Sequence, residues 1–504
     1  CVGAFAQKTI TGTVKDATGE PLIGVTIQTA KGGGTVTDYD GNFSLSNLKV
    51  GEKLTISYVG CKTKIVTVSN NPTMNIVLES SDKSLDEVVV IGYGTMKRRD
   101  LTGAVASVTG DKLAQNPVSN IAEALQGQLP GVTVTSQDGR PGASMSIRVR
   151  GGGSITQSND PLFIVDGVQV SSIDDIPADN IESIDVLKDA ASTAIYGARG
   201  ANGVILITTK NAKEGKVNVK YNMYFRVKEK PETYKQESAY DYVLRNWSYA
   251  TAYNTKDGQD IAKYFGVGSE NGNHLDEYKS MGTHNYQDDL LGSSHSWNHD
   301  LSISGGTERT KYYATLNYIN DKGSLNNTGF RRWNGNVKLT QDINKKLKWN
   351  LDARYSEMQF KGAKFEYATC SYNFRPIDTP LGEDDGSLLG LGDSHVSQSF
   401  NPVSIYDNYT SIHTRNRMRA NNSLIWTPIK GLTGKTELTL GRNWSEQKTW
   451  DGGFEEGYSH AKLKKSDGYH VKWTSTINYN VQGLGKDHKL DLLAGNEVLA
   501  SKSS

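Results

Sequence analysis

The chain has 504 residues, with 56 basic and 55 acidic side chains and three cysteines. This balance excludes the basic excess of nucleic-acid-binding proteins, and three cysteines cannot form a disulfide framework in so long a chain. No run of about 18 apolar residues exists, which excludes a transmembrane helix, although strands that alternate apolar and polar residues can still span a bilayer.

The first six residues end in Ala4-Phe5-Ala6, the small-x-small pattern of a signal-peptidase site. We therefore expect residues 1–6 to be the remnant of a signal peptide whose charged and apolar parts lie upstream. An ordinary flexible N-terminus is the alternative.

Residues 7–80 predict a small β-sandwich, because short β-rich runs alternate with turn signals such as 16–19 and 70–72. The aspartates of the turn 38–42 invite a calcium interpretation. Glycine does not stand at the sixth position that an EF-hand loop requires, so a plain turn is favoured. The residues expected to form the core are Ile10, Val14, Val25, Ile27, Phe43, Leu45, Ile56, Tyr58, Ile65, Val66, Val68, Ile76 and Leu78.

Residues 81–100 predict a linker that contains an extended segment. Four β-branched residues, 88–91, stand between polar residues and glycines, and the sequence does not indicate to which sheet they belong. The segment is either a strand of a neighbouring domain or a strand that adds to the sheet edge of a partner, and its position between two domains favours the partner. The whole segment is Asp86, Glu87, Val88, Val89, Val90, Ile91, Gly92, Tyr93 and Gly94.

Residues 101–212 mix helix and strand signals, so we expect an α+β domain. Asn120 can cap a helix that runs through Leu125 and Leu129 and ends at Pro130-Gly131. Strands are expected near 132–135, 145–149, 162–165 and 204–209.

Two glycine clusters in this domain, 151–153 and 197–203, mimic phosphate-binding loops. Neither has the GK[ST] ending of a Walker motif or the strand–turn–helix context of a dinucleotide site. Tight turns are the favoured interpretation, and no cofactor is expected.

From about residue 213 to 504 the pattern changes to long alternating strands. Apolar residues at every second position of 217–227 face one side and mostly polar residues face the other, over the length of a membrane-spanning β-strand. Further strands are expected at 297–305, 312–318, 331–341, 347–355, 418–426, 432–444, 469–479 and 490–494.

The connections between these strands alternate between short and longer. Outer-membrane barrels have this asymmetry, whereas a soluble β-sandwich has no reason to gather its short turns at one end. About nine strands are predicted. Single-chain bacterial barrels have an even number and no open edges in lipid, so we expect the barrel to be truncated at the C-terminal end.

Enzyme signatures are weak. The HxxE spacing of His274 and Glu277 matches carboxypeptidase zinc ligands, but it lies in a long polar segment without a supporting scaffold. No nucleophile-elbow motif or CxxC pair accompanies it. We expect no catalytic residue and no metal site.

Five motifs in a fixed order resemble those of SusC-like TonB-dependent outer-membrane transporters. They lie at 86–94, 146–151, 161–168, 181–189 and 194–203, after a first domain that resembles carboxypeptidase-regulatory-like domains. The resemblance covers nearly the whole chain.

The resemblance implies a mainly β protein with a β-sandwich, an α+β plug and an antiparallel transmembrane β-barrel of about 22 strands around the plug. Asp86–Gly94 would then be the TonB box, contacted by TonB with its ExbB–ExbD energising complex. A SusD-like surface lipoprotein is the further partner. The implied location is the outer membrane of a Gram-negative bacterium, with the first domain and the TonB box in the periplasm.

The implied activity is import of an oligomeric nutrient. We expect an oligosaccharide, with a peptide as the alternative. A receptor that signals across the envelope is the competing function, and deletion of residues 9–79 distinguishes it if induction is lost while uptake persists.

Three plug arginines, Arg148, Arg150 and Arg199, either bind an anionic ligand or, as favoured here, pair with carboxylates of the barrel wall. Tryptophans near strand ends, such as Trp297 and Trp473, either stack on sugars or, as favoured, belong to interfacial girdles. The plug loop 151–160 and the long loops 228–296 and 359–412 are expected to hold the cargo. The proposed plug contacts are Gly151, Gly152, Gly153, Ser154, Gln157 and Asn159.

Overall fold

The computed structural model forms two compact units, residues 1–102 and 103–504, each of which is described separately. The described residues are 8–16, 19–29, 33–48, 51–58, 64–68, 71, 73–78, 88–91, 94–97, 105–116, 118–152, 154–156, 158–253, 256–362, 374–377, 381–382, 402–452, 459–481 and 490–504. The expected signal-peptide remnant, residues 1–6, lies outside them.

The first unit contains a β-sandwich of a three-stranded and a four-stranded sheet. The strands of the first sheet, in spatial order, are β4 (Asn42–Leu48), β1 (Lys8–Asp16) and β7 (Thr73–Leu78). Those of the second are β3 (Gly34–Val36), β2 (Thr26–Thr29), β5 (Lys53–Ser57) and β6 (Lys64–Thr67). The sequence-based prediction of a sandwich is confirmed.

The core of this sandwich agrees with the prediction except at three positions. Ile65 is 64% exposed, whereas Leu48 and Leu54, which the prediction omitted, are buried. In the Asp38 turn, the carboxylate accepts hydrogen bonds from the backbone N–H of Asp40 at 3.0 Å and of Asn42 at 2.7 Å. The carboxylate thus closes the turn itself, as in an ordinary Asx turn.

The extended segment pairs with the residues that follow it. β8 (Val88–Ile91) and β9 (Gly94–Lys97) form an antiparallel hairpin in which Val88 pairs with Lys97 and Ile91 with Gly94. The other members of the predicted segment, Asp86, Glu87, Gly92 and Tyr93, lie outside the described residues.

The second unit begins with an α+β domain built on a five-stranded sheet. In spatial order its strands are β10 (Val105–Thr109), β15 (Ile181–Leu187), β16 (Val204–Thr209), β13 (Leu162–Val165) and β14 (Val168–Val170). A separate hairpin joins β11 (Val132–Ser136) and β12 (Met145–Val149). The short helices are α1 (Gly110–Ala114), α2 (Ile121–Ala124), η2 (Ala178–Asn180), α3 (Ala190–Thr193) and η3 (Ala194–Gly200).

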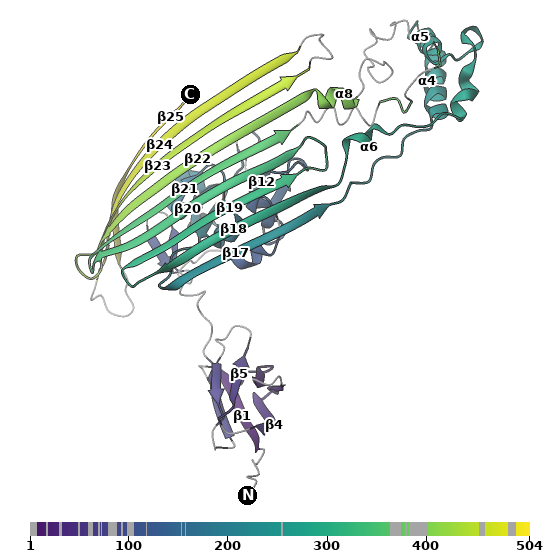
Figure 1. Cartoon of the computed structure of the whole chain (residues 1–504). Coiled ribbons are helices and arrows are strands. Elements are labelled where there is room, and N and C mark those ends of the chain that lie inside the picture. Colours follow the sequence, from purple (N-terminus) through teal and green to yellow (C-terminus); the bar gives the residue numbers. More distant parts are fainter. Residues whose placement is uncertain are drawn as a thin grey trace. The chain divides into compact units, whose positions relative to one another are not determined.

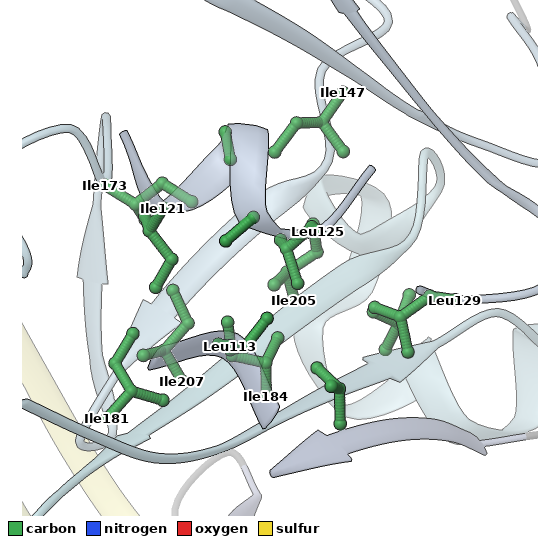
Figure 2. Packing of buried hydrophobic residues seen from close by; sticks show 14 of the residues in the cluster. Leu113, Ile121, Leu125, Leu129, Ile147, Ile173, Ile181, Ile184, Ile205 and Ile207 are labelled. Carbon is green, nitrogen blue, oxygen red and sulfur yellow. The ribbon is translucent and has the colours of Figure 1, made fainter. Parts of the chain in front are cut away.

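Helices α1 and α2 cover this sheet with apolar side chains. Leu113, Ile121 and Leu125 pack against Ile184 and Ile205 of the central strands, and all five are at most 2% exposed (Figure 2). Asn120 caps α2 as predicted, because its side-chain oxygen accepts a hydrogen bond from the backbone N–H of Ala122. The helix is shorter than expected, since it ends at Ala124 and turns lead from there towards Leu129.

The rest of the unit is a nine-stranded antiparallel sheet, here called the wall, which curves around the α+β domain (Figure 1). Neighbours along the chain are neighbours in the sheet, as the alternating pattern predicted. The strands are β17 (Gly215–Lys228), β18 (Ser294–Gly306), β19 (Thr310–Lys322), β20 (Gly329–Asn344), β21 (Leu347–Gly362), β22 (Tyr409–Trp426), β23 (Leu432–Asp451), β24 (His460–Asn480) and β25 (Asp491–Ser503).

The two faces of the wall differ in polarity. On β17 the residues Val217, Val219, Tyr221, Met223, Phe225 and Val227 are 55–66% exposed and face away from the α+β domain. An apolar outer face and a polar inner face are the arrangement of a barrel wall in lipid. None of the described helices is long and apolar enough to cross a membrane.

The connections between wall strands largely follow the predicted alternation. Short turns at 307–309, 345–346 and 427–431 alternate with longer links at 229–293, 323–328, 363–408 and 452–459. The last link, 481–490, is longer than the other links at the short-turn end and breaks the predicted alternation.

The long link 229–293 is not the open loop that its polar composition predicted. It folds into α4 (Ala239–Tyr253), α5 (Lys256–Phe265), η4 (Ser269–Asn271), η5 (His274–Lys279) and α6 (Tyr286–Leu290), and α8 (Pro402–Asp407) precedes β22. Tyr264 and Tyr278, which lie in the segment expected to hold the cargo, are at most 2% exposed and belong to the core of this helical cluster. Apolar residues scattered in sequence over 239–278 make that core, so local patterning did not reveal it.

Candidate functional site

The contact between the α+β domain and the wall is organised around the carboxylate of Asp166. Asp166 and Gly167 form the two-residue turn between β13 and β14, with φ of +50° and +84°. Asp-Gly suits such a turn, because both positions need positive φ. The turn holds the carboxylate between Thr209 and the wall strands.

Four groups donate to this carboxylate. The backbone N–H of Thr209 lies at 2.9 Å and its hydroxyl at 2.6 Å. From the wall, the Lys338 Nζ lies at 3.1 Å and an Arg354 Nη at 3.5 Å. Both cationic side chains are only 8% exposed. This cluster is therefore a buried ion-pair network that joins the two parts of the unit.

The protonation of Asp166 follows from these neighbours. Burial by itself raises the pKa of the carboxyl, but the charges of Lys338 and Arg354 and the hydrogen bonds from Thr209 outweigh burial and lower the pKa. Asp166 thus stays ionised in mild acid, and the pairing with the wall persists there.

A second contact lies in the loop after β14. Arg417 of β22 pairs with Asp175 at 3.0 Å. The guanidinium of Arg332, which is 3% exposed, donates to the carbonyls of Ser119 at 3.1 Å and Asp174 at 2.7 Å. Because these carbonyls belong to different segments, one wall arginine fixes both to β20.

A third contact lies near η2. Asn180 donates to the hydroxyl of Thr315 at 3.0 Å, and Asn222 donates to Asp179 at 3.1 Å. These neutral and charge-assisted hydrogen bonds extend the attachment to β17 and β19. In all, at least five wall strands hold the α+β domain.

The three arginines predicted to hold this domain to the wall have other partners. Arg148 pairs with Asp160 at 2.5 Å and Arg150 with Asp189 at 2.7 Å, both within the α+β domain, and Arg199 donates to Gln169 at 3.1 Å. Across the described part of the contact the predicted polarity is reversed. The α+β domain supplies carboxylates such as Asp166 and Asp175, and the wall supplies the cations.

Sequence reasoning missed Asp166, Lys338, Arg354 and Arg417. The Asp-Gly turn signal marked the position of Asp166, and the polar face of each wall strand marked the cations. Nothing local in the sequence paired them, because Lys338 lies 172 residues from Asp166.

The predicted cargo loop is held by its own residues. The Asn159 side chain accepts from the Ser154 N–H at 2.8 Å and donates to the Ser154 carbonyl at 2.6 Å. Gly151 has a φ of +94°, and a Cβ on Gly152 would lie 3.2 Å from the Asn159 amide. Two other predicted members, Gly153 and Gln157, lie outside the described residues. The turn interpretation of these glycines therefore fits the described geometry.

His274 and Glu277 form an exposed pair at 2.7 Å within η5. Among the residues that the structure describes, no group of three or more His, Cys, Asp or Glu side chains is placed to hold a metal ion. An ion pair between residues three apart on one turn accounts for their spacing.

Four tryptophans of the wall strands lie on its outer face. Trp297, Trp333, Trp426 and Trp473 are 39–54% exposed, in the strand registers that carry the apolar outer residues. This face points away from the lumen, which favours the interfacial girdle over sugar stacking.

Comparison with known proteins agrees with this architecture. Residues 97–204 match the TonB-dependent receptor plug domain family, and residues 10–90 match the carboxypeptidase-regulatory-like domain family. Among solved structures, the RagAB peptide importer in its open-open state superposes with a TM-score of 0.66 at 24% identity, covering 83% of this chain and 50% of that one.

Two relatives extend the sequence match. The TonB-dependent receptor P26 of Formosa agariphila is 33% identical over 98% of this chain and 49% of its own length. The TonB-dependent receptor SusC of Bacteroides thetaiotaomicron is 36% identical over 70% of this chain and 34% of its own length. This chain thus spans at most about half the length of these relatives. From the order of its domains, the plug held inside a polar wall and these matches, the chain belongs to the SusC-like TonB-dependent receptors.

Proposed function

We propose that the full-length receptor actively imports an oligomeric nutrient across the outer membrane, with TonB and ExbB–ExbD supplying the work. The observation that carries this proposal is the plug, bound inside the wall by the buried network of Asp166, Lys338 and Arg354. A passage closed by several buried ion pairs and hydrogen bonds is not expected to open spontaneously, because leaving even one charge of such a pair buried without its partner costs about 3–5 kcal/mol. Opening it calls for external work.

The route for that work is the segment Asp86–Gly94, proposed as the TonB box. An extended segment can pair with the sheet edge of a partner through its backbone, and these main-chain hydrogen bonds provide affinity that does not depend on the side chains. In the hairpin, β8 pairs with β9 through one edge, and among the described residues no strand pairs with its other edge, which could accept a partner strand. The N-terminal β-sandwich and this segment are proposed to lie in the periplasm.

The cargo proposed is an oligosaccharide rather than a peptide, delivered with the help of a SusD-like surface lipoprotein. Hydroxyl and amide groups that line a cavity between the plug and the wall, such as those of Ser171, Ser172 and Asn443, support a cargo rich in hydroxyl groups. The architecture shared with the RagAB importer supports a two-component assembly.

Deleting Glu87–Ile91 from the full-length receptor is expected to abolish uptake of labelled cargo in the native host while leaving membrane insertion intact. Deletion of the adjoining linker Ser80–Ser84 removes the same number of residues without touching the box and is the matched control. Uptake that continues unchanged in the first variant would overturn the coupling role. Equal loss in both variants would show that only the length of the connection matters.

A further inference from the structure

A cavity of about 380 Å³ lies between the plug and the wall strands β22–β25. Its plug side is formed by β14, the loop after it and Arg199 of η3. The lining charged and polar residues from the wall include Arg354, Arg417, Arg419, Thr439, Asn443, His470, Lys472, Glu497 and Ser501. Every one of these elements belongs to the same compact unit.

The register of the wall gathers cationic side chains on this face. Arg354, Arg419, Gly441, His470 and Ser501 pair in sequence across five neighbouring strands. Residues directly opposite each other on paired strands share a face. The row therefore runs across the inner face of the wall, where Arg354 already contacts the plug.

Gly441 makes room in this row. A Cβ at this position would lie only 2.1 Å from Cε1 of His470. The imidazole therefore lies over the glycine, in the space between its own strand and Arg419. Any other residue at 441 would displace the ring.

The cationic side chains outnumber the acidic ones around the cavity. Arg199, Arg354, Arg417, Arg419 and Lys472 line it together with only two carboxylates. Both carboxylates are already paired: Asp175 with Arg417 at 3.0 Å and Glu497 with Lys472 at 2.8 Å.

Arg419 is the cation that these pairs leave over. Within the described parts of the chain it forms neither a salt bridge nor a hydrogen bond, and its side chain is half-buried. Arg199 lines the same cavity from the plug, and its one hydrogen bond within the described parts of the chain goes to the neutral Gln169. A partly desolvated guanidinium that none of the described carboxylates contacts directly is unfavourable until an anion meets it.

We infer that this cavity binds a carboxylate or sulfate group of an acidic oligosaccharide, with Arg419 and Arg199 as its principal ligands. The inference rests on the proposed import function and specifies its cargo. The planar guanidinium fork matches both oxyanions, and it binds them with paired, charge-assisted hydrogen bonds. Hydroxyl and amide groups of Ser171, Ser172 and Asn443 line the same cavity and can pair with sugar hydroxyls.

The test is calorimetry on the full-length receptor with its lipoprotein partner. The probes are a short oligouronate, the same oligomer after reduction of its carboxyl groups, a sulfated neutral oligosaccharide and an acidic peptide. We expect one of the two acidic oligosaccharides to bind at least tenfold more tightly than the reduced oligomer. Arg419→Gln should weaken that binding by about ten- to a hundredfold.

Arg442→Gln is the matched control, because Arg442 is adjacent to Gly441 in sequence but lies on the opposite face, where it pairs with Asp467 at 2.8 Å. Arg199→Gln provides a second variant with an exposed side chain, in case Arg419→Gln fails to fold.

Equal binding of the reduced oligomer, or equal effects of the Arg419 and Arg442 variants, would overturn the inference while import stands. Binding of the acidic peptide alone would overturn the oligosaccharide assignment. A separate uptake assay tests import itself: if cells with the full-length receptor take up neither these probes nor any other oligomer, the import function is contradicted.

Discussion

Asp166→Asn in the full-length receptor is expected to loosen the plug and let large solutes leak through the outer membrane. Asparagine has nearly the same shape and, followed by Gly167, suits the same turn, so the change removes little besides the charge. Lys338 and Arg354 would remain buried without their counter-ion. Leaving one partner of a buried pair uncompensated costs about 3–5 kcal/mol. Sensitivity of cells to an antibiotic too large for porins measures the leak.

The matched control is Asp160→Asn, which removes another aspartate–arginine pair of the same plug. Asp160 is 61% exposed and its pair with Arg148 is correspondingly screened, so less than about 1 kcal/mol is at stake. We expect no leak from this variant. A leak of equal size in both would mean that plug charge in general, rather than the buried network, keeps the passage closed.

The pKa of Asp166 fixes how this closure depends on pH. Because the folded-state pKa is lowered relative to the unfolded value of about 3.9, the stabilisation is complete above that value and is lost as the pH falls through the folded pKa. Wild-type cells should therefore be as tight at pH 5 as at pH 7. Leakage that begins between those values would contradict the assignment of Asp166 as the closing carboxylate.

Gly110→Ala is the second substitution with a large expected effect, and it acts on the fold of the plug. Gly110 is buried at the start of α1, and a Cβ there would lie 1.8 Å from the carbonyl oxygen of Ile181 and 2.6 Å from its carbon. Because the obstacle is backbone of a central strand, no rotamer change relieves it. Overpacking of this kind costs about 1–3 kcal/mol or more.

Thermal unfolding and limited proteolysis of the detergent-solubilised full-length receptor measure this effect. We expect a lower Tm and faster cleavage within residues 105–209. Gly139→Ala is the control in the same domain, since nothing lies within 4 Å of a Cβ at that position. If the two variants behave alike, the close approach of Gly110 to β15 is not a determinant of plug stability.

The wall was predictable from sequence because its signal is local. In 217–227 each apolar residue is two positions from the next, and this period alone gives the strand, its two faces and the lipid-facing side. The cap of α2 at Asn120 was equally local. Short strands of the plug, such as Val105–Thr109 and Val168–Val170, were missed. A strand of so few residues is too short to show a clear alternation of apolar and polar positions.

The plug contacts were less predictable, because they depend on which residues meet in space. Arg148 and Arg150 looked like residues for the wall, but carboxylates within the plug are closer to them. Tyr278 lies in a polar segment that was expected to be a cargo-binding loop, but it is buried and donates its hydroxyl to the Phe265 carbonyl at 2.9 Å. In both cases the role depends on the three-dimensional packing of the plug or of the loop, which the local sequence pattern does not reveal.

The most direct test of energised import is the initial rate of uptake in cells whose proton-motive force has been collapsed by a protonophore. Cells carrying the full-length receptor should still bind labelled oligosaccharide at their surface, because the plug and outer segments are unchanged. Uptake should fall to the rate of cells that lack the receptor, since the buried attachment of the plug no longer receives work through the segment Asp86–Gly94. Uptake that continues at the original rate would contradict this and would identify the protein as a passive channel.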